Sequence, residues 1–458
     1  MNGAAHHMVA KILKVLFVGL LFHLFILGVL YYIGVPSFVL SFLRFWKEML
    51  LVGLFAGVLL NPALVRRQRS LNSFDFAVIS LLALGVIYLL FFSPFAEVLV
   101  SEFTEFRVYV YVGMIYWIGR SVNLDEDQVL GIFRTFSLAV LFSGVISVIN
   151  HILFGYGLIS LADNYYASFS LTSQFGQTVT TEDLLNLLYT PYSQIRDLNG
   201  SYLSLGNTLF FANIFFLVSY YYKRKKRDLQ FFFLGSLIIV LTGARAATGV
   251  FLLTSLFILA VNFRRPAISV GLIALVALFF MTVPGLSEKF SDMVSDISDL
   301  EATAGHVGGW NNFIDAFVNR PLGYGFGVGE RSAATFGTTQ LIGGESNLSH
   351  VVGNMGIFGG IAWMAMIIFS WVRSARLNRQ SRSAPISILS FTALAVGIGY
   401  FVVALTQYLN DNLEASLPIW FLVGWVGIQA YQLKKHREQV AGFLARDRNG
   451  SALMLPHP

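Results

Sequence analysis

Ionisable side chains gather in a polar stretch, from Gly285 to about Ser349, that lies between two strongly apolar segments. Glu345 precedes the second apolar segment, and Arg320 and Arg331 flank a glycine-rich loop. A partly desolvated carboxylate has a raised pKa and can take a proton from a hydroxyl group. A guanidinium group can bind phosphate through paired hydrogen bonds. We therefore expect a reaction or binding site in this stretch, at one edge of a membrane.

The glycine-rich loop GYGFGVG runs from Gly323 to Gly329 and contains Gly325 and Gly327. Glycines permit positive φ and let backbone amides approach a ligand closely, as in a phosphate cradle. The spacing matches neither a P-loop nor a dinucleotide-binding fingerprint, and we expect no strand before it. Two interpretations stay open: a tight turn without a ligand, and a backbone cradle for an anion.

Arg245 stands in the segment LTGARAATG, which has apolar residues on both sides. A guanidinium buried near a membrane interface is costly without an anionic partner. Arg245 could reach the lipid headgroups, as basic residues near span ends often do, or it could clamp a phosphate or pyrophosphate. The distribution of basic residues along the chain puts Arg196, Arg320 and Arg331 on the same side of the membrane as Arg245. Each of them is either an ordinary loop charge or a further part of that clamp.

Glu345 is a candidate general base; its alternative roles are a solvated loop acid or a cap for the following helix. Ser346 and Asn347 would serve equally well as caps. His350 would fall within the first turns of that helix, where a single histidine is more typical of hydrogen-bonded structure, and His306 lies in the polar stretch. No pair of these histidines and acids has the spacing of metal ligands, so we expect neither a metal nor a cofactor.

The composition is that of an integral membrane protein. Of the 458 residues, 56% are hydrophobic and only 12% are charged, and the mean hydropathy is +0.67. Soluble domains carry about 25% charged residues. The net charge of +6 comes from basic residues scattered through short loops, which indicates a topology signal rather than a nucleic-acid partner. The absence of cysteine excludes disulfides and thiolate sites.

About twelve apolar stretches are long enough to cross a bilayer as helices, which takes about 20 residues. They occupy residues 12–34, 45–61, 74–93, 104–119, 129–150, 203–222, 229–243, 246–262, 267–284, 348–372, 386–409 and 416–432. An even number of spans puts both termini on one side. Most of the 31 Lys and Arg residues fall in the loops on that side, which makes it the cytoplasm.

The fold class that follows is an all-α polytopic membrane protein with about 12 transmembrane helices. Helices 1–5 fall in residues 1–150, helices 6–9 in 203–284 and helices 10–12 in 348–432, followed by a cytoplasmic tail at 433–458. Two long loops, 151–202 and 285–347, face outside. In the later loop we expect two amphipathic helices on the membrane surface, over 286–300 and over 310–318, the second ending at Arg320-Pro321.

Three segments resemble motifs of the O-antigen ligase and polymerase superfamily, whose fold is GT-C-like. ESNLSHVVGNMGIFGG is similar to its end-of-loop motif, in which a His or Glu and a small polar residue precede a Gly-x-x-Gly helix start, here Gly356 and Gly359. WNNFIDAFVNRPLGYGFGVG is similar to its aromatic helix with a following Pro-Leu-Gly-x-Gly-x-Gly loop, and LTGARAATG to its Arg-centred motif. The likeness covers residues 240–360, in the order and topology of that family.

The resemblance implies that glycan passes from an undecaprenyl-pyrophosphate donor to an acceptor sugar hydroxyl at the periplasmic face of the bacterial inner membrane. Arg245 would hold the pyrophosphate leaving group, and Glu345 would take the proton from the acceptor as the anomeric carbon inverts. The remaining substrate-binding candidates are Arg196, His306, Arg320, Gly325, Gly327, Arg331, Asn347 and His350. A chain-length regulator protein is a further candidate partner, besides the lipid bilayer.

Glutamate at position 345 favours a polymerase of O-antigen, capsule or exopolysaccharide over a ligase to lipid A core, which more often has histidine there. His306 stands where relatives often carry an arginine, so the second arginine of the site stays open. The alternative from another class is a transporter or flippase for lipid-linked sugars, which would place ionisable groups near the bilayer midplane. Here the charges concentrate in the outside loops, which favours surface chemistry. A non-enzymatic assembly protein would leave Arg245 and Glu345 without a role.

Overall fold

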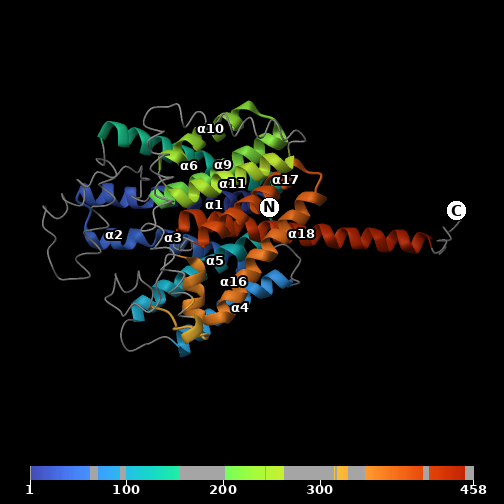
Figure 1. Cartoon of the computed structure of the whole chain (residues 1–458), viewed down its shortest axis with the longest axis horizontal. Coiled ribbons are helices and arrows are strands. Elements are labelled where there is room, and N and C mark those ends of the chain that lie inside the picture. The colour runs from blue at the N-terminus through green and yellow to red at the C-terminus, as the bar shows by residue number, and fades with distance from the viewer. Residues whose placement is uncertain are drawn as a thin grey trace.

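The computed structural model describes a helical bundle (Figure 1). The described residues are 2–61, 71–92, 99–154, 202–242, 244–262, 314, 317–327, 346–405 and 412–448. Seven helices in this part are long and apolar enough to cross a membrane. The all-α, membrane-embedded class predicted from the sequence is therefore confirmed.

The helices follow the predicted apolar runs closely. They are α1 (Asn2–Tyr32), α2 (Ser37–Arg44), α3 (Trp46–Leu60), α4 (Ser73–Phe91), α5 (Leu99–Ser121), α6 (Glu126–Phe154), α9 (Tyr202–Lys223), α10 (Lys226–Leu241), α11 (Arg245–Asn262), α16 (Asn347–Gln380), α17 (Ala384–Ala404) and α18 (Leu413–Arg448). Every expected span except 267–284 overlaps one of them. Span 267–284, the surface helix at 286–300 and nearly all of loop 151–202 lie outside the described residues. The total of twelve spans stays a prediction.

The second expected span, 45–61, corresponds to α3, and a short helix that the sequence did not predict, α2, precedes it. Pro36 precedes α2, and Phe45 is the only residue between α2 and α3. Leu40 of α2 packs on Leu27 of α1, so the α2–α3 pair runs back along α1. Residues 37–44 form a helix because their apolar side chains contact α1. The basic residue Arg44 ends this helix.

Helix α9 lies at the centre of the bundle. It contacts α6, α10, α11, α17 and α18, and most of its residues are buried inside the bundle. By contrast, α2, α3 and α4 expose large apolar side chains such as Phe38, Leu60 and Phe91. Exposed apolar side chains of this kind are what lipid contact requires. Beyond the bundle, the last part of α18 projects as a single helix toward the C-terminus (Figure 1).

Two ion pairs, each with a fully buried aspartate, mark one edge of the bundle, which we call the Arg120 edge. Asp75 accepts hydrogen bonds from Arg120 and from the Tyr116 hydroxyl, which joins α4 to α5. Arg134 and Asp228 pair at 2.7 Å and join α6 to α10. Charged groups in a low-dielectric environment persist only when they are paired, so these contacts fix the order of the helices at this edge.

Candidate functional site

The glycine loop begins where a short helical segment stops. Residues 317–319 are helical and Arg320 is not, as the sequence Arg320-Pro321 predicted. Gly323, Gly325 and Gly327 have φ of +83°, +87° and +87°. This region of φ strains residues with a Cβ atom, so the alternating glycines are required by the backbone path of the loop.

The loop packs into a break in α16. Gly356 has φ 62° and ψ −162°, which interrupts the helix. In a continuous helix the carbonyl groups of Gly353 and Asn354 would accept hydrogen bonds from amides four residues later. Instead they accept from the loop, from the Tyr324 amide at 2.7 Å and the Gly325 amide at 3.1 Å. The loop therefore replaces the hydrogen bonds that the break removes.

The contact between the loop and α16 is reciprocal and tight. The Ile357 amide, also freed by the break, donates to the Pro321 carbonyl oxygen at 2.9 Å. A Cβ atom on Gly323 would lie 2.5 Å from the Gly356 backbone nitrogen, and one on Gly356 would lie 2.5 Å from the Leu322 carbonyl carbon. Only glycine fits on both sides of this interface. Two of the three motifs that carry the family resemblance therefore contact each other directly.

The other side of the loop is held by the beginning of α5. The Gly327 amide donates to the Glu105 carboxylate at 2.9 Å, and the Ser101 hydroxyl donates to the Gly327 carbonyl oxygen at 3.2 Å. Phe326 is completely buried; its ring centroid lies 5.6 Å from that of Phe106. These contacts place the loop between α5 and α16, where polar and aromatic contacts together fix its position.

Glu102 lies beside this anchor, in the first turn of α5. Its side chain is 1% exposed, and neither carboxylate oxygen has a hydrogen-bond partner among the described residues. Burial raises the pKa of the Glu102 carboxyl above its usual range. Glu102, Glu105 and Ser101 were not expected as site residues from the sequence. The sequence did offer one indication of a site. Glu102 and Glu105 are three residues apart, which places both carboxylates on one face at the start of an apolar helix.

The loop's backbone amides are largely occupied by protein acceptors. Gly323 donates to the Arg320 carbonyl oxygen, and Tyr324, Gly325 and Gly327 donate as described above. A phosphate cradle needs several such amides directed at the ligand. Of the two interpretations of the glycine loop, this pattern favours the tight turn over the anion cradle. Gly325 and Gly327 then fix the backbone path of the loop between α16 and α5.

Among the candidate cations, Arg320 is exposed, and its guanidinium carbon lies 5.4 Å from the ring centroid of Tyr324. That cation–π contact holds the Arg320 guanidinium over the Tyr324 ring of the loop. Arg196, His306, Arg331 and Glu345 lie outside the described residues. Their roles in the site stay predictions.

The beginning of α16 follows Glu345 directly. Ser346 caps the helix, since its hydroxyl oxygen accepts from the Ser349 amide at 3.0 Å, as expected for one of the two candidate caps. Asn347 is fully buried, and its side-chain amide donates to the Tyr400 hydroxyl of α17 at 3.4 Å. His350 is also buried, in the first turns of the helix as predicted.

Arg245 is the first residue of α11, and the course of its side chain is outside the described part. The end of α17 connects this helix start to that of α16. A Cβ atom on Gly399 would lie 2.8 Å from Val250 in α11, and the next residue, Tyr400, binds Asn347 in α16. The beginnings of α5, α11 and α16 thus lie at one edge, opposite the Arg120 edge, which we call the Ser346 edge. The backbone positions of Arg245 and Ser346 share this edge.

The fold and this edge define the class of the molecule: an all-α polytopic membrane protein with a polar loop packed into a broken helix at one edge. No protein-family model matches the chain, and a comparison with curated proteins finds no relative. The described residues contain no group of three or more His, Cys, Asp or Glu side chains arranged to hold a metal ion.

Proposed function

We propose that the protein is a bacterial membrane glycosyltransferase that polymerises a surface polysaccharide. Its donor is glycan on undecaprenyl pyrophosphate, and its acceptor is a sugar hydroxyl at the Ser346 edge, which we assign to the periplasmic face of the inner membrane. The ligase variant, which would transfer finished glycan to lipid A core or another acceptor, uses the same chemistry with a different acceptor.

In the proposed reaction the acceptor oxygen bonds to the anomeric carbon, and the bond between that carbon and the pyrophosphate oxygen breaks. Glu345 takes the acceptor proton, and Arg245 binds the pyrophosphate as its negative charge grows. Pyrophosphate is a good leaving group, so orientation of the two substrates and two charged groups can supply most of the catalysis. Arg320 and Arg331 are candidates for a second cation.

The observation that carries the proposal is the packing of the glycine loop into the break at Gly356. Both segments belong to the set that resembles the polymerase and ligase superfamily, and their mutual hydrogen bonds explain why the two motifs would occur together. The common edge of α11 and α16 supports a site that combines Arg245 with Glu345, although about 100 residues separate them in sequence.

A transporter is the alternative from another class, and a broken helix is a feature that transporters use. In transporters the groups freed by the break bind substrate or ions. Here the carbonyl groups of Gly353 and Asn354 and the amide of Ile357 are all bound by the loop. The break therefore supports a fixed polar surface better than it supports a transport site.

The test is complementation of a deletion strain, with surface glycan resolved by chain length. Wild type is expected to restore a ladder of chain lengths, whereas Glu345→Gln and Arg245→Ala should leave single repeats. Matched controls are Glu438→Gln and Arg379→Ala, which change exposed charges on the C-terminal parts of α18 and α16 and should restore the ladder.

Membrane levels of every variant are measured, so that loss of protein is not read as loss of activity. Complete loss of capping with accumulation of lipid-linked polymer would identify a ligase instead. Accumulation of donor on the cytoplasmic leaflet would identify a flippase. Normal ladders from both Glu345→Gln and Arg245→Ala would refute the proposed site.

A further inference from the structure

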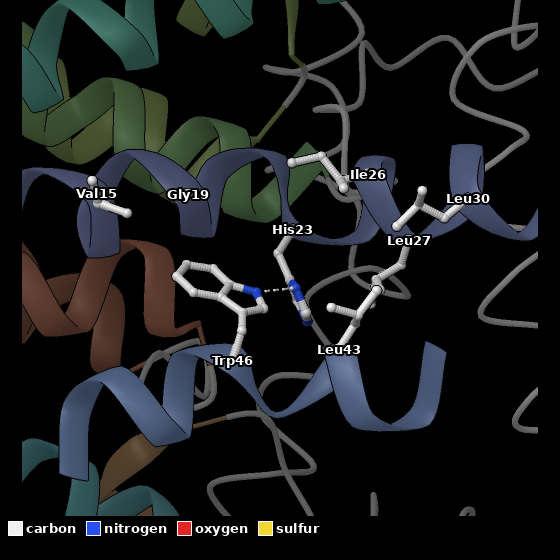
Figure 2. A pocket seen from close by; sticks show the side chains of 8 residues that line it. All are labelled: Val15, Gly19, His23, Ile26, Leu27, Leu30, Leu43 and Trp46. Atoms are coloured by element: carbon white, nitrogen blue, oxygen red, sulfur yellow. Dashed lines mark hydrogen bonds between the residues drawn. The ribbon is translucent and has the colours of Figure 1, made fainter. Parts of the chain in front are cut away.

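A cavity of about 280 Å³ lies between α1 and the α2–α3 pair, away from the glycine loop. Figure 2 shows its lining: Val15, Gly19, His23, Ile26, Leu27, Leu30, Leu43 and Trp46. Cavities of roughly 150 Å³ with apolar walls already admit benzene. The lining extends from residue 15 to residue 30 of α1, which is about 22 Å along a helix. Its volume and length suit one hydrocarbon chain.

His23 is the polar residue of this lining. Its Nδ1 accepts a hydrogen bond from the Trp46 indole at 2.8 Å, as Figure 2 shows, and its ring is 4% exposed. A neutral imidazole that accepts at Nδ1 carries its proton on Nε2. The indole and the imidazole therefore satisfy each other at the cavity wall, and the rest of the lining is apolar.

Charged side chains lie next to the cavity, inside the bundle's membrane-spanning part. Lys47 is within electrostatic range of Arg44, Arg107, Glu48 and Glu414. Lys47 is partly buried and makes neither a hydrogen bond nor an ion pair with the described residues. An ammonium group in this position needs an anion.

The helix register gives the depth of this group. Arg107 lies 13 residues before Arg120, which is about 20 Å along α5 and within a hydrocarbon core of about 30 Å. Lys47 lies at a similar depth, because the next residue, Glu48, accepts a hydrogen bond from Tyr111, about one turn after Arg107 in α5. Long basic side chains extend toward the nearer interface, here the Ser346 edge. Lys47 can therefore meet a lipid phosphate while the chain of the same lipid enters the cavity.

We propose that the cavity and Lys47 form a binding site for one anionic phospholipid. A hydrocarbon chain of the lipid lies along α1 between His23 and the α2–α3 pair, and Lys47 binds its phosphodiester group. The ammonium group of Lys47 favours an anionic lipid, because Lys47 has no ion pair among the described residues. This site is independent of the proposed glycosyl transfer.

Trp46 is a reporter built into the site. The protein is reconstituted in phosphatidylcholine vesicles that contain increasing fractions of phosphatidylglycerol brominated on its acyl chains, and tryptophan fluorescence is measured. Bromine quenches indole on contact, and subtraction of the Trp46→Phe signal isolates Trp46. Quenching is expected at a lower mole fraction of brominated phosphatidylglycerol than of brominated phosphatidylcholine.

Lys47→Gln should raise the half-quenching mole fraction of brominated phosphatidylglycerol about fivefold, the effect of one basic residue near the interface. Lys47→Arg should keep the wild-type value. The control Lys434→Gln removes an exposed lysine in the C-terminal half of α18 and should change nothing. Equal quenching by the two brominated lipids, or no effect of Lys47→Gln, would overturn the proposal. Displacement by undecaprenyl phosphate at a lower fraction than phosphatidylglycerol would assign the site to a polyprenyl lipid instead.

Discussion

Replacement of Gly356 by alanine tests whether the glycine loop and the break in α16 depend on each other. The new Cβ atom would lie 2.5 Å from the Pro321 carbonyl oxygen and from the Leu322 carbonyl carbon, both backbone atoms. Backbone atoms cannot rotate away as the end of a side chain can. We therefore expect Gly356→Ala to expel the loop from the break rather than to compress it.

The magnitude follows from the contacts that would be lost. The loop and α16 exchange hydrogen bonds from Tyr324, Gly325 and Ile357, and each contributes about 1 kcal/mol net. A non-glycine residue at positive φ costs a further 1 to 2 kcal/mol, roughly. Opening of the loop should thus become easier by about 4 to 5 kcal/mol, which corresponds to an increase of about 1000-fold or more in amide exchange.

The assay is hydrogen exchange of the Tyr324 and Gly325 amides in purified protein, with thermal unfolding measured on the same samples. Gly53→Ala is the matched control, because a Cβ atom at this exposed position in α3 would meet nothing within 4 Å. That variant should be equal to wild type or more stable by up to about 1 kcal/mol. Unchanged exchange at both amides in Gly356→Ala would refute the coupling of the loop to the break.

Three further substitutions test other contacts by thermal unfolding. Asp75→Asn should destabilise the bundle by about 3 kcal/mol, because it leaves the Arg120 guanidinium buried without its anion; a loss below about 1 kcal/mol would show that the pair is dispensable. Ser346→Ala should cost about 1 kcal/mol by removing the cap on the Ser349 amide, whereas Ser346→Asp should retain it. Glu102→Gln should change the pH dependence: because burial raises the pKa of Glu102, wild-type stability falls as pH rises above the ordinary glutamate value, and the variant should lack that fall. Parallel pH profiles would contradict this origin.

The helices were predictable because a membrane imposes one requirement on every span, about 20 apolar residues with their backbone groups bonded within the helix. That requirement places α4, α9 and α17 within a few residues of their predicted bounds. It does not predict α2, an eight-residue helix whose contact with α1 depends on Leu40 and Leu27. Leu27 and Leu40 lie on different helices joined by a turn, so their contact produces no periodic pattern in the sequence.

The candidate site was predictable in its parts but not in its assembly. The glycine spacing indicated positive φ, and Gly323, Gly325 and Gly327 have it. The break at Gly356 could not be predicted, because glycine is also common in regular spanning helices. Its hydrogen bonds to Tyr324 and Pro321 depend on which loop reaches it. The same holds for Glu105, which binds Gly327 across more than 200 residues of sequence.

The anchored loop constrains where the proposed base can lie. Gly327 is fixed to α5 through Glu105, and Ser346 is fixed in α16 as its cap, so both described ends of the segment that carries Glu345 lie at the Ser346 edge. A general base needs a position accurate to a fraction of an ångström. Loss of the contact at Gly356 would remove the other anchor of the loop, a few residues before Gly327, without altering Glu345 itself. The rate of the proposed glycosyl transfer should therefore fall in Gly356→Ala, whereas the proposed binding of the donor by Arg245 should persist. This result would separate the positioning of Glu345 from the binding of the leaving group.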